Sequence, residues 1–338
     1  MAHRPAVGRM ARTNLALALV VFVGWLVLGG DRALEAIAIH WPVSLTMALG
    51  SMVGGGTSEG GGAVGFPVLT KVLAVPADQA RLFSFAIQSV GMGAATITIV
   101  RNRVPLEWRA IRYGAPPAAL GVAVSSLVLA PLLPAPTVRL LFTAVLVSMG
   151  LALWISRRFA PNRRDALDIL GPRERAILVG AGLVGGALSG LAAVGENTVM
   201  FAVLVLGFRV CERTVTPTTV VLLTIVTWTG FATHALVIGD FTGPVVDMWL
   251  AAVPVVAVGA PLGALLMTRM SRTAIVWILY VLISIEFAST LLLVPMSSGA
   301  AVLFALAILG SSAVCVRMAT AARYRVPADR MEVLAPAG

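Results

Sequence analysis

A glycine-rich break interrupts the apolar sequence twice, and the two copies lie 135 residues apart. The first copy, GSMVGGGTSEGGGAVGFPVL, runs from Gly50 to Leu69, and the second, GGALSGLAAVGENTVMFAVL, runs from Gly185 to Leu204. Seven of the twenty aligned positions are identical without a gap, which indicates an internal duplication. Two interrupted hydrophobic segments at matching positions in the halves of a membrane protein indicate the substrate site of a transporter.

The composition is that of an integral membrane protein. Hydrophobic residues make up 59% of the chain, charged residues only 12%, and the mean hydropathy is +0.95, whereas soluble domains carry roughly 25% charged residues. A spanning helix needs about 20 mostly apolar residues. Eight full spans are expected, near residues 14–30, 80–100, 114–133, 136–156, 218–238, 250–268, 273–294 and 301–316.

Basic residues predict the orientation, because short cytoplasmic loops carry the excess of Lys and Arg. Placing both termini in the cytoplasm assigns 21 of the 25 basic residues to that side, together with the loops at 101–113, 157–175, 208–217 and 269–272. The glycine-rich regions 41–74 and 176–207 are each too long for one crossing and too short for two. In this orientation the first region begins and ends outside, and the second begins and ends inside.

Each glycine-rich region is therefore predicted to form a re-entrant hairpin of two half-helices that meet at the glycines. The predicted fold is an all-α integral membrane protein with about eight full transmembrane helices plus two re-entrant half-helix hairpins in an inverted-topology repeat. The expected division is a cytoplasmic N-terminus with the first transmembrane helix (1–40), a first transporter repeat (41–158), a cytoplasmic linker (159–174), a second, inverted repeat (175–294), and a last transmembrane helix with a cytoplasmic tail (295–338).

The tips of the two hairpins are the predicted substrate site. Irregular backbone at membrane depth is tolerated only where it is buried in protein or lines a water-filled cavity. A half-helix that starts just after a glycine tip directs free N–H groups towards the tip, which suits an anion. Close helix packing is the alternative role of the glycines, and for the duplicated cluster we favour a site. The candidates are Gly60, Gly61, Gly62 and Ala63 at the first tip and Gly195, Glu196, Asn197 and Thr198 at the second.

Polar residues on the helix that follows each hairpin extend this candidate site. Ser84 and Gln88 share one face of the first such helix, and Thr219 corresponds to Ser84 under the duplication. Such faces either line a path or form interhelical hydrogen bonds. Gln88 is the stronger candidate, because an amide costs more to leave unpaired than a hydroxyl.

Ionisable groups at membrane depth are costly and indicate function. The candidates for coupling transport to an ion are Glu59, Glu196 and Glu286. For Glu286, a neutral acid hydrogen-bonded to a neighbouring helix is an equal alternative. Lys71 and Arg81 are interpreted as snorkelling anchors rather than anion attractors, and His234 as a packed or interfacial histidine rather than a proton relay.

A family resemblance rests on the first tip, where Gly60-Gly61-Gly62 is followed by AVGF and then by Pro67-Val68-Leu69. This pattern, repeated in the second half, resembles the sulfite exporter TauE/SafE family of membrane permeases, and the resemblance covers roughly residues 45–294. It implies transport of a small anion at the two tips, since members are implicated in moving sulfite, sulfonates or sulfoacetate. The second tip departs from the family pattern, with Gly195-Glu196-Asn197 in place of three glycines and Ala202 in place of proline.

The expected function is a secondary transporter, a permease or exporter, that moves a small anion such as a sulfur oxyanion or organosulfonate across the bacterial inner membrane with proton or ion coupling. A channel, or a cation-coupled carrier of another small solute, is the alternative. No enzyme and no cofactor are expected, because neither a clustered catalytic motif nor a P-loop occurs. The expected partners are the small anion and the lipid bilayer. Basic residues scattered between spans argue against nucleic acid despite the net charge of +10, and homo-oligomerisation is left open.

Overall fold

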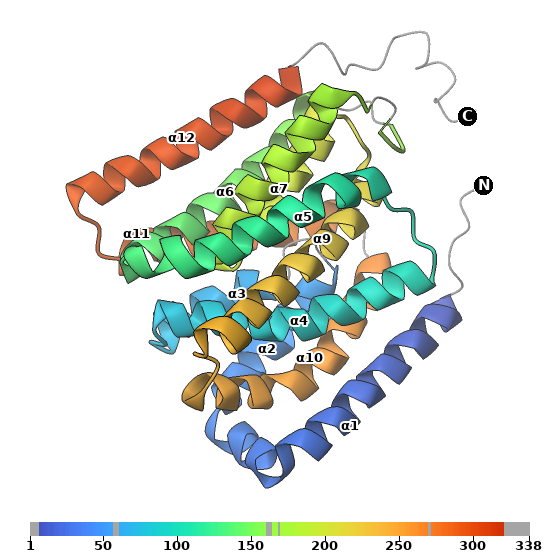
Figure 1. The fold of residues 1–338 in the computed structure, drawn as a ribbon, viewed down its shortest axis with the longest axis vertical. Helices are drawn as coiled ribbons and strands as arrows, with labels where there is room; N and C mark the ends of the chain where they lie inside the picture. Colours follow the sequence, from blue (N-terminus) through green and yellow to red (C-terminus); the bar gives the residue numbers. More distant parts are fainter. Residues whose placement is uncertain (1–6, 57–60, 160–163, 168–169, 270–271, 321–338) are drawn as a thin grey trace.

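The computed structural model describes residues 7–56, 61–159, 164–167, 170–269 and 272–320. Its regular secondary structure within them is helical, with turns and loops between the helices and one isolated bridge between Arg164 and Val210 (Figure 1). The first half comprises α1 (Val7–Ile39), α2 (Trp41–Gly56), α3 (Gly62–Pro67), η1 (Val68–Val72), α4 (Ala77–Arg101), α5 (Trp108–Val124), η2 (Ser125–Leu129), η3 (Ala130–Leu132) and α6 (Ala135–Phe159). The second half comprises α7 (Pro172–Ala192), α8 (Glu196–Ala202), η4 (Val203–Gly207), α9 (Glu212–Ala232), η5 (Thr233–Ile238), α10 (Gly243–Arg269), α11 (Arg272–Leu293) and α12 (Ser298–Thr320).

Eight helices of the described chain are long and apolar enough to cross a membrane, as expected. Seven of them coincide with the predicted spans. The eighth is α7, the first arm of the second glycine-rich region, at 21 residues. The predicted span 273–294 forms α11, in which the apolar stretch Trp277–Leu293 is shorter than a full crossing.

The element bounds recur at the spacing of the sequence duplication. The π-helical segments η1 and η4, which end the two half-helices, are 135 residues apart, and so are the first residues of α4 and α9 and those of α5 and α10. Each half therefore contains the same run of elements: an arm, a glycine tip, a short half-helix with a π-helical end, and two long helices.

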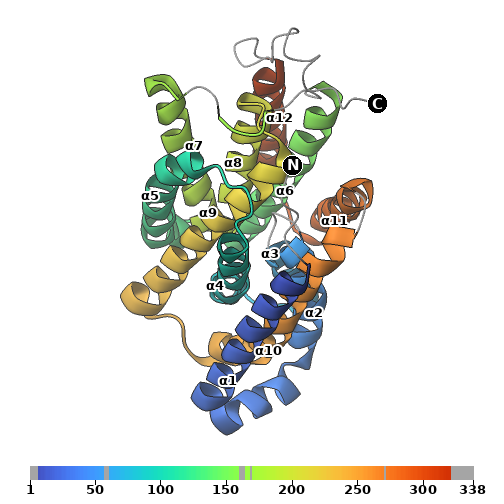
Figure 2. The same ribbon diagram turned by 90° about the vertical axis from the view of Figure 1, so that its right-hand side faces the viewer.

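The halves pack crosswise. The arm α2 of the first half lies against α10 of the second, and the arm α7 of the second half lies against α5 of the first (Figure 2). Small residues allow these close approaches: a Cβ on Gly186 or Gly182 of α7 would collide with the carbonyl of Ala118 or Gly114 in α5. Backbones that approach through glycine pack well where no hydrophobic force drives helices together.

The core consists of two main apolar clusters, and the second tip reaches into the first of them. One cluster surrounds α3, with Met47, Phe66 and Phe83 among its members, and it also includes Ala192 and Val194 from the second tip. The other surrounds α8 and η4. Between them α4 and α9 cross at the centre of the molecule, so the tips and these two helices form its middle.

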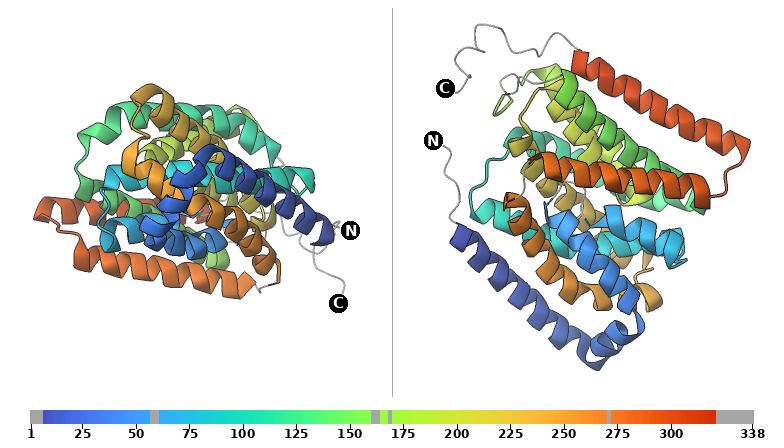
Figure 3. Two further views of the ribbon diagram at one scale, coloured as in Figure 1. Left: turned by 90° about the horizontal axis from the view of Figure 1, so that it is seen from below. Right: turned by 180° about the vertical axis from the view of Figure 1, so that it is seen from behind.

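The first and last helices lie at opposite edges, with α1 along one side and α12 along the other (Figure 3). Only 17% of the apolar stretch of α1 and 11% of that of α12 are buried. Their exposed side chains are large hydrophobics such as Leu28 and Leu309, which is the surface that lipid contact requires.

Candidate functional site

Gln88 of α4 lies between the two glycine tips. Its side chain is buried, and its Nε2 atom donates a hydrogen bond to the Ala193 carbonyl at the second tip, at 3.4 Å. On the other side, a Cβ on Gly62 at the first tip would lie 2.8 Å from the same Nε2 atom. One side chain therefore contacts both tips, and it does so because Gly62 has no side chain.

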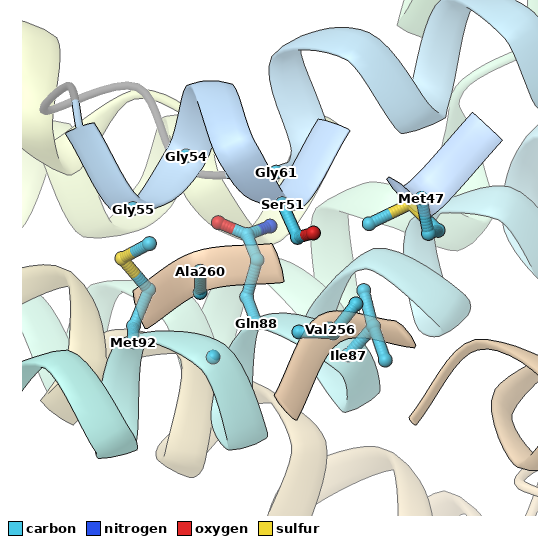
Figure 4. A pocket seen from close by; sticks show the side chains of 11 residues that line it. Met47, Ser51, Gly54, Gly55, Gly61, Ile87, Gln88, Met92, Val256 and Ala260 are labelled. Carbon is cyan, nitrogen blue, oxygen red and sulfur yellow. The ribbon is translucent and has the colours of Figure 1, made fainter. Parts of the chain in front are cut away.

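A small cavity of about 10 Å³ lies beside Gln88, between α2, α4 and α10. Figure 4 shows the Gln88 amide directed towards the segment of α2 that carries Ser51 and Gly54. Gly61 of the first tip and Gly91 of α4 also line the cavity. Such a volume is close to that of one water molecule, so the tips are closed around Gln88.

The second tip contains a buried carboxylate. Glu196 is fully buried, and neither of its carboxylate oxygens has a hydrogen-bond partner among the described residues. Its backbone N–H donates to the Ser189 hydroxyl of α7 at 3.0 Å, which fixes the start of α8. The preceding Gly195 has φ +147°, a conformation that favours glycine. The backbone therefore holds Glu196 inside the protein, although a buried polar group without a partner is costly.

The hydroxyl and amide groups near the second tip differ in their hydrogen bonding. Asn197 is buried, and its Oδ1 atom accepts from the Gly195 N–H at 3.3 Å. The Thr198 hydroxyl is buried and has no partner among the described residues. Glu196 and Thr198 are thus the two tip residues with unused hydrogen-bonding capacity.

The remaining predicted residues take less direct positions. Ser84 donates to its own helix at Ala80, 2.8 Å away, and Thr219 donates to Thr216 at 2.9 Å. Both side chains are buried, but these bonds do not connect them to the tips. Ala63 is the second residue of α3, whereas Glu59 and Gly60 lie outside the described residues.

Comparison with known proteins gives one match. The family described as Sulfite exporter TauE/SafE matches residues 43–290. The chain belongs to this family. No curated protein and no solved structure matches it.

Membership in the TauE/SafE family makes the chain a multi-pass membrane transporter, in a family named for the export of a sulfur compound. The matched region contains both tips, the crossing helices α4 and α9, and most of α11. The resemblance inferred from the glycine pattern of the tips is confirmed.

This TauE/SafE chain also contains a buried ion pair that was not expected from its sequence. Lys71, at the end of η1, pairs with Glu286 of α11, with 2.6 Å between Nζ and Oε2 and with both side chains 4% exposed. Lys71 also donates to the hydroxyls of Ser289 at 2.9 Å and Thr290 at 2.8 Å. The interpretation of Lys71 as a snorkelling anchor is therefore replaced by a buried ion pair.

Glu286 also contacts a neighbouring helix, but as the ion-pair partner of Lys71 rather than as the neutral acid that one alternative proposed. The Thr143 hydroxyl of α6 donates to its Oε1 atom at 2.7 Å and lies 2.7 Å from the Thr290 hydroxyl. The network links the end of the first half-helix to α6 and α11. The signal in the sequence was that Lys71 is the chain's single lysine, although sequence alone does not pair it with a residue 215 positions away.

Proposed function

We propose that the chain is a secondary transporter of a small sulfur oxyanion or organosulfonate, with the substrate bound where the two tips meet at Gln88. The observation that supports this most directly is the Gln88 side chain, which contacts both tips of a duplicated element. In transporters with duplicated broken helices, the substrate site lies at the interface of the repeats. An amide that donates to a tip carbonyl over 3.4 Å makes a weak bond, so a substrate oxygen can replace that carbonyl as its acceptor.

Transport through this site requires the tips to separate. The cavity of about 10 Å³ beside Gln88 has room for about one water molecule, and a sulfite ion is larger. The closed arrangement therefore corresponds to an occluded state. Each arm packs against the opposite half, α2 on α10 and α7 on α5. Movement of one half against the other therefore shifts the arms and opens the site to one face at a time.

Glu196 is the proposed coupling residue. An ionised carboxylate at its position has no partner and would repel an anion bound at the tips, so substrate binding and ionisation oppose each other. A protonated Glu196 removes that repulsion and supplies an O–H donor. We infer that the anion and a proton occupy the second tip together.

The proposed setting is the bacterial inner membrane with both termini in the cytoplasm, following the distribution of basic residues. In this orientation the end of α4 near Ala77 and the end of η5 at Ile238 face outward.

The test is uptake into proteoliposomes of labelled sulfite, thiosulfate, taurine, sulfoacetate and lactate, with and without an imposed pH gradient. Wild-type protein and Glu196→Gln are compared with Glu35→Gln, the same substitution on the exposed surface of α1. We expect saturable flux of one anion that the gradient accelerates, and a Glu196→Gln protein that no longer responds to the gradient. Absence of flux for every anion from folded protein rejects the substrate class. Flux that does not saturate favours the channel.

A further inference from the structure

Arg81 is a buried cation without a counterion in contact. It lies in the second turn of α4 and is 7% exposed, its Nε atom has no hydrogen-bond partner, and no described residue forms an ion pair with it. Arg32, by contrast, is 57% exposed in its side chain and pairs with Asp247 at 2.8 Å. A guanidinium withdrawn from water is costly unless a partner binds it, and no carboxylate of the described residues is in contact with Arg81.

His234 of η5 presents a second unused group beside the same helix. Its side chain is 1% exposed, its Nδ1 atom lies 2.9 Å from Asp240 Oδ2, and its Nε2 atom has no partner among the described residues. The ring packs beside Phe85 of α4, with ring centroids 5.9 Å apart. Phe85 follows Arg81 by one helical turn, so α4 brings Arg81 and the ring to the same region.

The charged groups around this region are Arg81 and Asp78 on α4, and His234 and Asp240 beyond α9. Arg81 interacts electrostatically with both carboxylates and with the histidine. Asp240 is engaged by His234, and Asp78 is exposed to solvent. Neither carboxylate therefore satisfies the guanidinium, and the segment η2, which also packs against η5, carries no titratable residue.

The position of Arg81 relates this region to the tips. Arg81, Phe85 and Gln88 are spaced by four and then three residues, which places them along one face of α4. Arg81 lies two turns before Gln88, at the end of α4 that faces outward in the proposed orientation. An anion bound at Arg81 is therefore on the same helix face that leads to the junction of the tips.

The geometry points to an outer anion-binding site formed by the Arg81 guanidinium and the His234 ring, which binds a sulfite or sulfonate oxyanion before it reaches Gln88. Planar guanidinium groups bind such oxyanions through paired N–H bonds. The histidine donates from Nε2 only when both ring nitrogens carry protons, with Asp240 accepting from Nδ1 and a proton taken from the outer solution. This site rests on the proposed transport function and adds its first binding step.

The test measures KM and maximal rate for labelled sulfite uptake by proteoliposomes containing Arg81→Gln, Arg81→Lys, His234→Gln or the control Arg32→Gln. We expect Arg81→Gln to raise KM roughly tenfold or more, because a hydrogen-bonded charge is lost, with a smaller change in maximal rate. Arg81→Lys keeps the charge without the planar fork and is expected to be intermediate. In wild type, KM rises as outer pH rises and the ring loses its proton. In His234→Gln, KM is higher and rises less steeply with outer pH, because the contribution of the ring is lost while that of Glu196 remains.

Binding without transport separates this site from the transport function itself. Sulfite is titrated into detergent-purified wild type and variants, and the shift in melting temperature is recorded. A shift in wild type and Arg32→Gln that is lost in Arg81→Gln supports the site even if no flux is found, in which case only the transport function fails. Unchanged KM in both Arg81→Gln and His234→Gln overturns the site. A reduced maximal rate at constant KM also overturns it, because that result indicates a structural role. If Arg81→Gln does not fold, Arg81→Lys decides by the same criteria.

Discussion

At the scale of single residues, Lys71 and Glu286 form a buried ion pair that several hydroxyl groups surround. Its salt bridge of 2.6 Å is supplemented by hydroxyls from Ser289, Thr290 and Thr143. Removing one partner of a buried pair leaves an uncompensated charge, whereas removing both leaves none. The pair therefore ties the first half-helix to α11, and a coupling role for Glu286 stays a prediction.

We predict that Lys71→Met lowers the free energy of unfolding by about 3 to 5 kcal/mol, and that adding Glu286→Gln restores much of this loss. The measurement is denaturant or thermal unfolding of purified protein in one detergent. The control is Arg32→Met, which removes an exposed pair worth about 1 kcal/mol or less. Equal destabilisation by the single and double variants would contradict the assignment of a charge pair.

At the scale of elements, the crosswise contact of α7 with α5 depends on glycines in α7. Gly182 and Gly186 face Gly114 and Ala118 at backbone distance. Gly180, on the same helix, has no atom within 4 Å of the position that a Cβ would take. The same substitution on one helix therefore meets either another backbone or open space.

We predict that Gly186→Ala destabilises the protein by about 1 to 3 kcal/mol, because overpacking forces α7 away from α5. Gly180→Ala is expected to be neutral or to stabilise by up to about 1 kcal/mol, because alanine favours a helix. Melting temperatures of the two variants in the same detergent compare them directly. Similar values for both would show that α7 and α5 do not approach through Gly186.

At the scale of the whole molecule, α1 and α12 form the lipid-exposed edges and the two halves interlock between them (Figure 1). We infer the orientation of this assembly from charge alone, since short loops rich in arginine stay in the cytoplasm. The proposed orientation places the segment between α11 and α12 outside and the linker between α6 and α7 inside.

We predict that a membrane-impermeant maleimide labels Ser297→Cys in intact cells and labels Ala166→Cys only after the membrane is permeabilised. Both positions are exposed, and both variants are made in a chain that carries Cys211→Ser and Cys315→Ser. Labelling in the opposite sense would invert the orientation and would move the Arg81 region to the cytoplasmic face.

Several features were predictable because they depend on local sequence. The helical membrane fold, the positions of most spans and the two glycine breaks follow from apolar runs of about 20 residues and from the duplicated pattern at Gly50–Leu69 and Gly185–Leu204. The family resemblance also followed from this pattern and is confirmed by the match over residues 43–290. The length of α7 was missed, because the glycine-rich region 176–207 was interpreted as a re-entrant hairpin of two half-helices.

The sequence by itself determined that the chain is a helical membrane protein with a glycine pattern that occurs twice, because hydropathy and repetition are properties of consecutive residues. Only the tertiary structure decided that Gln88 contacts both tips, that Lys71 pairs with Glu286, and that Arg81 is buried without a partner. These facts join residues up to 215 positions apart. Such pairings depend on how helices pack, and the burial that makes a charge costly does not exist until they have packed.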